Sequence, residues 1–266
     1  MSAVSLCYEF CARTHAGKVR TNNEDAVSID ALAQLALLAD GMGGYNAGEV
    51  ASGMAISFIH SEMARWLAQA GPRLKAFDLR RAMEICVDNA NQAILGAAEA
   101  NPQCAGMGTT LVLGVFQGPR LMLGHIGDSR CYRLRGGQLE QLTRDHSWLQ
   151  EQIDAGLLTQ QQAAVSSSRN LVTRALGVEE VVLLEVNEFE VQTDDLYLMC
   201  SDGLSEMLHH DDLTNLLVAR SALEEKAARL IDAANANGGR DNISVVLARA
   251  SAGPRKQGLM SRLLRA

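Results

Sequence analysis

The sequence predicts an α+β fold in which two packed antiparallel β-sheets are covered by helices. Strand-like runs follow one another directly between residues 106 and 143, and again between 181 and 200. Helical patterns occur as two tandem pairs, with no strand between the members of a pair. A parallel sheet would require strict alternation of strands and helices, so this order favours segregated layers of sheet and helix.

The first hundred residues contain strands followed by two long helices. Residues 7–13 alternate apolar and polar side chains, as a half-buried strand does, and the apolar run "LAQLALLA" at 32–39 predicts a buried strand. Apolar side chains at helical spacing predict helices over 48–70 and 76–100. A proline follows shortly after each helix, where it cannot continue the helical backbone.

The middle of the chain predicts an antiparallel meander followed by a polar excursion. Between 106 and 143, short runs of Thr, Val, Leu, Ile and Tyr are separated by the turn signals "QGPR" and "RGGQ". The segment 147–169 is polar and rich in glutamine, with a short amphipathic helix expected over 148–157. Its low apolar content is typical of a mobile flap and equally of an ordinary solvated helix and loop.

The last third of the chain returns to strands and adds the second helical pair. Strands are expected at 181–191, 195–200 and 242–250, and helices at 211–218 and 221–236. Ser221 and Glu224 match a capping box at the start of the last helix. Residues 252–266 carry basic side chains and no acid, so we expect one domain over 1–251 and a flexible basic tail.

Composition excludes several classes of protein. The 266 residues are 47% hydrophobic and 21% charged, which is typical of one large globular domain, and the net charge is -7. Basic residues are scattered through an acidic body, so nucleic acid is not expected as a partner. The N-terminus lacks a signal peptide, and no window reaches the roughly 18 apolar residues of a transmembrane segment. We therefore expect a cytoplasmic protein whose six cysteines, with no C-x-x-C pair, are mostly buried thiols.

Four acids flank four of the predicted strands. Asp40 follows "LALLA", Asp128 follows "LMLGHIG", Asp202 follows "LYLMCS" and Asp241 precedes "NISVVLA". A single aspartate at a strand end is most often a turn former or a cap. Four carboxylates gathered at one end of a sheet would repel one another unless a cation lay among them. No histidine or cysteine belongs to these motifs, so the all-oxygen donor set predicts Mn²⁺ or Mg²⁺ rather than Zn²⁺.

The stretch "GKVRTNNEDAV" adds a guanidinium to these acids. It supplies Arg20, Glu24 and Asp25 just before a further strand. An arginine beside a metal site can hold a phosphoryl group through two parallel hydrogen bonds, so Arg20 is a candidate phosphate ligand. The alternative is a surface arginine paired with Glu24, and this segment alone does not distinguish the two.

Two other phosphate-binding patterns are weak. Cys7 and Arg13 have the C-x5-R spacing of cysteine-dependent phosphatases, but no glycine lies between them to cradle a phosphate. The stretch "DGMGGYN" is similar to a nucleotide-binding loop, but Asn46 stands where G-x-G-x-x-G requires its last glycine. A strand is the better account of the first pattern.

Seven blocks of the sequence occur in the order seen in one known family. They are "VRTNNEDA", "LADGMGG", "GHIGDSRCY", "LTRDHS", "LVTRALG", "CSDGL" and "GGRDNISVVL", and they extend from Arg20 to Leu247. The chain resembles the protein phosphatase 2C family of metal-dependent Ser/Thr phosphatases, and its "DGMGG" form is similar to the bacterial stand-alone branch. Seven ordered blocks are far more specific than any single motif.

The resemblance implies a four-layer αββα sandwich, with antiparallel helix pairs outside two antiparallel sheets and a metal centre at one end between the sheets. It implies a catalytic domain over 1–251 that includes a flap at 147–169. By the same resemblance, two core metal ions and a third, weaker one would be bound by Glu24, Asp40, the carbonyl of Gly41, Asp128, Asp202 and Asp241. Asp25 and Asn242 would support these ligands by hydrogen bonding, and Arg20 would clamp the substrate phosphate.

The implied reaction is hydrolysis of phosphoserine and phosphothreonine monoesters by direct attack of a hydroxide that bridges two metal ions, with Asp40 between them. Met42 departs from the family, because many eukaryotic members carry a histidine there that resembles a general acid. A thioether cannot donate a proton. The proton for the leaving oxygen must then come from a metal-bound water or from a histidine such as His146, or the step proceeds without help.

The resemblance also implies partners, namely phosphorylated proteins and a cognate bacterial Ser/Thr kinase whose action the protein would reverse, and it is typical of a monomer. Two other functions are weighed against it. A catalytically inactive relative that binds phosphoproteins is disfavoured because all four acids are present. A metal-dependent phosphodiesterase acting on nucleic acid is disfavoured by the acidic body of the chain.

Overall fold

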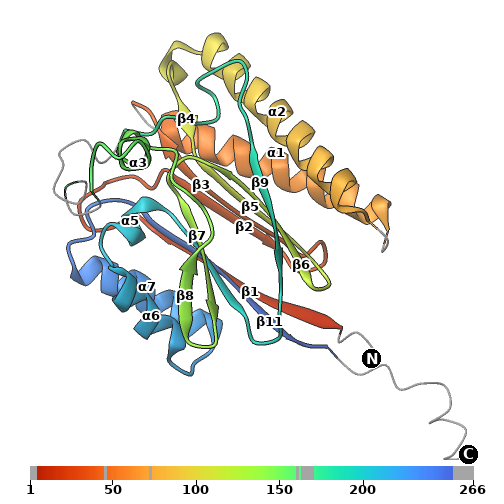
Figure 1. Ribbon diagram of the computed structural model, residues 1–266. Helices are drawn as coiled ribbons and strands as arrows, with labels where there is room; N and C mark the ends of the chain where they lie inside the picture. Colours follow the sequence, from red (N-terminus) through yellow and green to blue (C-terminus); the bar gives the residue numbers. More distant parts are fainter. Residues whose placement is uncertain (1–4, 45–46, 72–73, 160–161, 163–170, 254–266) are drawn as a thin grey trace, which may run out of the picture.

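The chain folds into four layers, two β-sheets packed face to face with helices on both outer faces (Figure 1). The computed structural model describes residues 5–44, 47–71, 74–159, 162 and 171–253. Every strand pair in the two sheets is antiparallel. The predicted α+β class with two antiparallel sheets and flanking helix pairs is confirmed.

The first sheet joins the two ends of the described chain. Its strand order is β1 (Leu6–His15), β11 (Ile243–Ala252), β10 (Leu196–Cys200), β7 (Arg130–Arg135) and β8 (Gln138–Gln141). The β1–β11 pair is ten residues long and runs from Leu6 opposite Ala252 to His15 opposite Ile243. This long-range pairing brings the segment after β1 beside the segment before β11.

The second sheet holds the predicted strand before Asp40 in its interior. Its order is β2 (Asp25–Asp30), β3 (Leu35–Met42), β5 (Leu111–Gln117), β6 (Arg120–Ile126) and β9 (Glu185–Glu190), and the short β4 (Gly108–Thr109) pairs with the end of β3. All apolar side chains of β3 from Leu35 to Ala39 are fully buried. A strand that is buried on both faces is apolar throughout instead of alternating, which explains the continuous run in the sequence.

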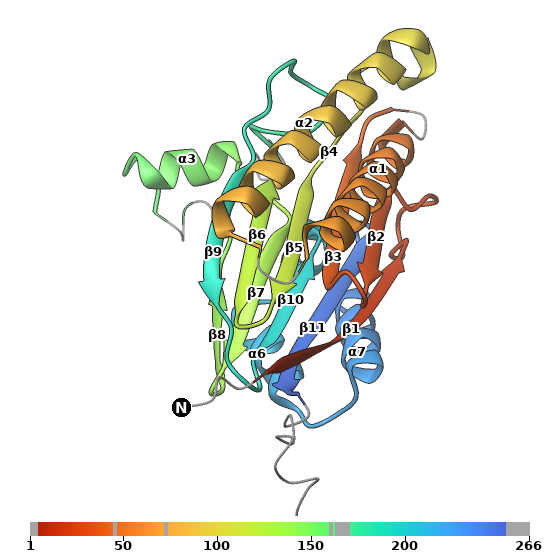
Figure 2. The ribbon, with the colours of Figure 1, turned by 90° about the vertical axis from the view of Figure 1, so that its right-hand side faces the viewer.

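Three hydrophobic clusters hold the layers together. Between the sheets, Phe116 and Tyr197 meet edge to face with their ring centroids 5.4 Å apart, and both rings are fully buried. The outer face of the second sheet is covered by α1 (Ala47–Ala70) and α2 (Ala76–Ala100) (Figure 2). The outer face of the first sheet is covered by α6 (His210–Val218) and α7 (Leu223–Ala236). The remaining helical pieces are η1 (Pro102–Cys104), α3 (Trp148–Asp154) and α5 (Asp202–Ser205).

Several predicted boundaries were wrong for identifiable reasons. The strand expected at 32–39 begins only at Leu35, because Gln34 has a φ of 55° and closes the turn before it, and it continues through Asp40 to Met42. The strand expected at 181–191 covers only Glu185–Glu190. The expected capping box is also absent, since the N-cap of α7 is Ala222 and its side chain makes no cap hydrogen bond.

Other expectations fall partly outside the described residues. The short helix of the flap is present as α3, whereas residues 160–161 and 163–170 lie outside the described part. The last strand reaches Ala252. Residues 254–266 of the expected tail also lie outside the described part of the chain. All six cysteines are free thiols and five are buried; the exception, Cys7, lies in β1 as the strand interpretation expects. None of the described helices is long and apolar enough to cross a membrane.

Candidate metal centre

The predicted acids converge on one cavity of about 210 Å³ at one end of the sheets. Five of its lining residues carry carboxylates, and they come from five separate parts of the chain. The cavity is lined by Arg20, Glu24, Asp40, Gly41, Met42, Gly43, Thr110, Asp128, Val172, Asp202, Asp241 and Asn242. Every predicted site residue except Asp25 therefore lines the same space.

The fold places each acid at the end of a strand or in the turn that follows. Asp40 lies near the end of β3, opposite Asp25 on β2. Asp128 lies in the turn between β6 and β7, and Asp202 opens α5 directly after β10. Asp241 precedes β11 by two residues. Because the strands that carry them belong to both sheets, the two sheets meet with their acid-bearing ends together.

Burial and mutual repulsion make these carboxyl groups reluctant to ionise in the absence of a cation. Burial raises the pKa of Asp40 well above its usual range, and the charges of Asp25 and Asp202 raise it further. Burial likewise raises the pKa of Asp202, with Asp128 as the strongest repelling neighbour. The pKa of Asp128 is raised to about 6, chiefly by burial and then by Asp145. A divalent cation among these oxygens would reverse the balance, since it stabilises the ionised form.

The glycines after the acids allow backbone segments to touch. A Cβ added at Gly41 would lie 2.1 Å from the carbonyl oxygen of Gly48 and 2.6 Å from that of Glu24. A Cβ added at Gly203 would lie 2.0 Å from the carbonyl oxygen of Asn242. Real Cβ atoms do not approach so closely, so these two positions require glycine. The close contacts draw the acid-bearing turns together around the cavity.

Asp25 and Asn242 brace the cavity from behind. The hydroxyl of Ser201 donates to Asp25 Oδ2 at 2.8 Å, while the buried Asp25 Oδ1 has no hydrogen-bond partner among the described residues. Asn242 Oδ1 accepts from the backbone N–H of Glu24 at 2.7 Å, and its Nδ2 donates to the carbonyl oxygen of Ala16 at 3.1 Å. The donor set that lines the cavity, carboxylates and a backbone carbonyl, is all oxygen and fits a hard cation such as Mg²⁺ or Mn²⁺.

Arg20 forms an ion pair with an acid of the cavity, Asp241, and not with Glu24. Its Nη2 lies 2.7 Å from Asp241 Oδ2, and its side chain is 55% exposed. The hydrogen bond to Asp241 raises the pKa of Arg20. The surface pair with Glu24, the alternative left open by the sequence, is not formed. An exposed guanidinium tethered to one side of the cavity can reach a ligand that enters from solvent.

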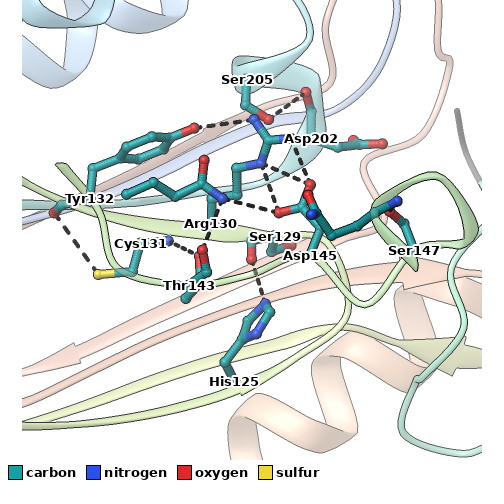
Figure 3. Close-up of polar contacts among 12 residues, drawn as sticks. His125, Ser129, Arg130, Cys131, Tyr132, Thr143, Asp145, Ser147, Asp202 and Ser205 are labelled. Carbon is teal, nitrogen blue, oxygen red and sulfur yellow. Dashed lines mark hydrogen bonds and ion pairs between the residues drawn. The ribbon is translucent and has the colours of Figure 1, made fainter. Parts of the chain in front are cut away.

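The sequence analysis missed an ion pair that holds the turn of Asp128. Figure 3 shows the Arg130 guanidinium against the carboxylate of Asp145. Its Nε donates to Asp145 Oδ1 at 2.9 Å and its Nη2 donates to Oδ2 at 2.6 Å. Arg130 stands two residues after Asp128, and Asp145 precedes His146, so the pair ties together two turns beside the cavity. Both residues lie in the conspicuous sequence blocks, Arg130 in "GHIGDSRCY" and Asp145 in "LTRDHS", and their opposite charges could have indicated the pair.

His146 is not placed to donate a proton into the cavity. It is buried and is absent from the described residues that line the cavity. Its Nδ1 accepts the backbone N–H of Gly127 at 3.1 Å, so the neutral ring carries its proton on Nε2. That nitrogen lies 3.1 Å from Glu185 Oε2, which accepts the proton in a hydrogen bond. Met42, by contrast, does line the cavity, at the position where the resemblance places a histidine in many eukaryotic members.

Comparison with known proteins agrees with this geometry. A family model described as Protein phosphatase 2C matches residues 13–248. The Ser/Thr phosphatase stp of Listeria monocytogenes is 35% identical over 238 residues, which are 88% of this chain and 93% of that protein. The Ser/Thr phosphatase PstP of Mycobacterium tuberculosis is 41% identical over 248 residues, which are 93% of this chain but only 46% of the longer mycobacterial protein.

Solved structures show the same similarity in three dimensions. The crystal structure of Mycobacterium tuberculosis PstP superposes with a TM-score of 0.83 at 39% identity, covering 91% of this chain and 98% of that chain. The catalytic domain of PstP in complex with two manganese ions superposes with a TM-score of 0.80, also at 39% identity, covering 93% of this chain and all (100%) of that chain. This chain therefore belongs to the protein phosphatase 2C family.

Proposed function

We propose that this protein is a metal-dependent protein phosphatase that hydrolyses phosphoserine and phosphothreonine monoesters. One observation carries the proposal, namely that five carboxylates from distant segments line a single cavity together with the guanidinium of Arg20. Without cations, the negative charge of these acids would repel a phosphate group. Cations bound among the acids would make it a site for a phosphate group.

We propose that the cavity binds two core cations and a third, weaker one, all Mn²⁺ or Mg²⁺, as the family resemblance implies. We propose that Asp40, Asp202 and Asp241 would hold the first of these cations, and that Asp40, the carbonyl of Gly41 and Glu24 would hold the second. Asp128 would share the weaker ion with Asp202, in agreement with the repulsion between these two groups. The two manganese ions in the PstP catalytic domain support the proposal of two core cations.

Bound cations of this kind lower the pKa of a water and offset the negative charge that develops on a phosphoryl group. The protein's own residues would do the rest. Arg20 would exchange its bond to Asp241 for the substrate phosphate, which holds the ester in line for attack. Asp25 and Asn242 would keep the acids in position through the bonds described above. The described lining includes no histidine, so we propose that water supplies the proton to the leaving oxygen.

We propose further that the substrates are phosphoproteins modified by a bacterial Ser/Thr kinase and that the protein works as a cytoplasmic monomer. The names of the similar proteins, serine/threonine phosphatases from Listeria and Mycobacterium, support the substrate class. We also propose that residues 1–251 form the catalytic domain, with 147–169 as its flap. The similarity of 93% of the chain to the PstP catalytic domain supports this division.

The decisive experiment compares the parent protein with Asp202→Asn on a phosphothreonine peptide and on p-nitrophenyl phosphate, with Mn²⁺ and with excess chelator. We expect phosphate release by the parent only with Mn²⁺, and a loss of at least about a hundredfold in kcat in the variant. A calorimetric Mn²⁺ titration of both proteins reads the cation site without requiring turnover. The variant should lose the tightest binding event.

Two outcomes would contradict the proposal. Mn²⁺ binding without phosphate release from either substrate would indicate an inactive phosphoprotein binder. Faster hydrolysis of bis-p-nitrophenyl phosphate than of the monoester would indicate a phosphodiesterase. Asp211→Asn is a matched control, because this exposed acid lies on the first turn of α6 and does not line the cavity.

A further inference from the structure

A second cavity adjoins the metal centre. It measures about 360 Å³, and its lining is mostly aliphatic. It is lined by Met42, Val172, Thr173, Arg174, Ala175, Val178, Glu179, Val181, Val182 and Leu183. Met42 and Val172 also line the cavity of the acids, so the two spaces are contiguous. We name this second space the apolar groove.

Hydrogen bonds hold the middle of the wall of the apolar groove in place, although the wall has no regular secondary structure. Asn91 on α2 binds it twice, since its Nδ2 donates to the carbonyl oxygen of Glu179 at 2.8 Å and its Oδ1 accepts from the N–H of Gly177 at 2.7 Å. Leu176 exchanges both backbone hydrogen bonds with Thr109, at 2.9 and 3.0 Å. Figure 2 shows this chain segment, between α3 and β9, lying along α2. The groove is therefore preformed.

Anchoring this wall leaves large apolar side chains in solvent. Val178 is 56% exposed, and Val181 and Leu183 are each 70% exposed. Their neighbours Val182 and Leu184 instead pack against the core of α1 and α2. Exposure thus alternates along 181–184, although all four residues are apolar and the whole run was predicted as a strand. Single exposed aliphatic side chains are common, but three along one fixed wall beside a catalytic cavity are typical of a binding surface.

Met42 joins the groove to the metal centre. The space that a Cβ at Gly108 would occupy lies 3.2 Å from Met42 Cε and 2.9 Å from Val178 Cγ2. The thioether end and the valine methyl therefore lie on the same side of β4. A methionine here provides an apolar, adaptable boundary between the phosphate position and the groove, which a histidine would not provide.

We propose that the apolar groove binds an aliphatic side chain of the phosphoprotein substrate, within about three residues of the phosphorylated Ser or Thr. An extended peptide advances roughly 3.3 Å per residue, so a chain whose phosphate lies among the acids reaches the contiguous groove within that span. The groove carries one cation, Arg174, and one anion, Glu179, so its net charge favours neither sign. We therefore expect the groove to select substrates by apolar contact with their side chains. This inference rests on the proposed phosphatase function.

The test uses two phosphothreonine peptides of equal length and charge, one with leucines and one with serines at the three positions on each side. The measured quantity is the ratio of their kcat/KM values with Mn²⁺. We expect the parent to favour the leucine peptide by about tenfold, the effect of burying one aliphatic side chain. In the double variant Val181→Ser/Leu183→Ser, the ratio should fall to about two. Leu32→Ser is the matched control, because Leu32 is 98% exposed and does not line the groove.

The test distinguishes failure of the groove proposal from failure of the proposed phosphatase function. Equal kcat/KM values for the two peptides in the parent, or an unchanged preference in the double variant, would overturn the groove while p-nitrophenyl phosphate hydrolysis upholds the phosphatase function. Absence of hydrolysis of all three substrates would overturn both. Concentration-dependent dimerisation that the double variant abolishes would show that a second copy of the chain occupies the groove, and would also overturn the proposal.

Discussion

Removing the guanidinium of Arg130 should destabilise the protein and weaken its metal centre together. Arg130→Met retains most of the aliphatic stem and removes the charge. The side chain of Asp145 is only 10% exposed, and without Arg130 its remaining hydrogen-bond partner among the described residues is Gln141 Nε2 at 3.3 Å. The substitution therefore leaves a carboxylate buried with one weak hydrogen bond.

The size of the effect follows from the exposure of the pair. Breaking a buried ion pair by removing one partner costs about 3–5 kcal/mol of unfolding free energy. The side chain of Arg130 is 31% exposed, so water can reach the vacated space and the lower end of that range applies. A loss of about 3 kcal/mol corresponds to a decrease in Tm of about 6–12 °C for a domain of this size.

The same substitution should also weaken metal binding, through its effect on the ionisation of Asp128. Arg130 lowers the pKa of Asp128, whereas Asp145 raises it. With the guanidinium removed and Asp145 retained, Asp128 becomes harder to ionise and binds a cation less tightly. We expect the Mn²⁺ concentration for half-maximal activity to rise several-fold, with a smaller change in kcat at saturating Mn²⁺.

Urea unfolding in chelator measures the stability, and the double variant Arg130→Met/Asp145→Leu provides the control. Replacing both partners by apolar residues of similar volume removes the buried charge, so most of the lost stability should return. If Arg130→Met unfolds within about 1 kcal/mol of the parent, or if the double variant is no more stable than the single one, the ion pair does not hold the turn of Asp128.

Three further predictions concern the cavity itself. Gly41→Ala should destabilise the protein by about 3 kcal/mol and abolish activity, because the added methyl would lie 2.1 Å from the carbonyl oxygen of Gly48; a soluble variant with the parent Tm would contradict the close contact. In chelator, Asp128→Asn should be more stable than the parent by up to about 2 kcal/mol at pH 7.5, and the difference should vanish as the pH falls from about 6 to about 4. The sign follows because the folded pKa of Asp128 is raised to about 6, so its ionised form opposes folding above the unfolded pKa; a difference that grows toward acid pH in urea unfolding would refute this. Arg20→Ala should raise the KM for a phosphopeptide about tenfold or more and leave Mn²⁺ affinity within about threefold, and unchanged phosphopeptide kinetics would remove its role.

Local pattern was sufficient for the elements whose hydrophobic spacing is long and regular. The helices over 48–70 and 76–100 lie within one residue of α1 and α2. The buried run before Asp40 identified β3, although its true end at Met42 was missed because the strand continues through the acid and glycine of the site. Strand-end acids are visible in sequence because a carboxylate after an apolar run breaks the pattern that surrounds it.

The exposed apolar wall of the groove shows where local pattern fails. Residues 181–184 are an apolar run like that of a buried strand, but Asn91 binds the preceding turn to α2, and the strand begins only at Glu185. An apolar run indicates side chains suited to burial, and it does not report whether a partner strand lies alongside. Nothing within the segment indicates that its outward side chains remain in solvent beside the acids.

The sequence by itself determined the α+β class, the two helix pairs and the set of acids that a hard cation would need. Tertiary structure decided which groups face one another: Arg20 meets Asp241, 221 residues away, and Asp25 keeps an unpartnered oxygen behind the cavity. The physical reason is that helical and strand periodicity depends on neighbours along the chain. The convergence of charges depends on the pairing of β1 with β11 and on backbone contacts that only glycine permits, and both join residues far apart in the sequence.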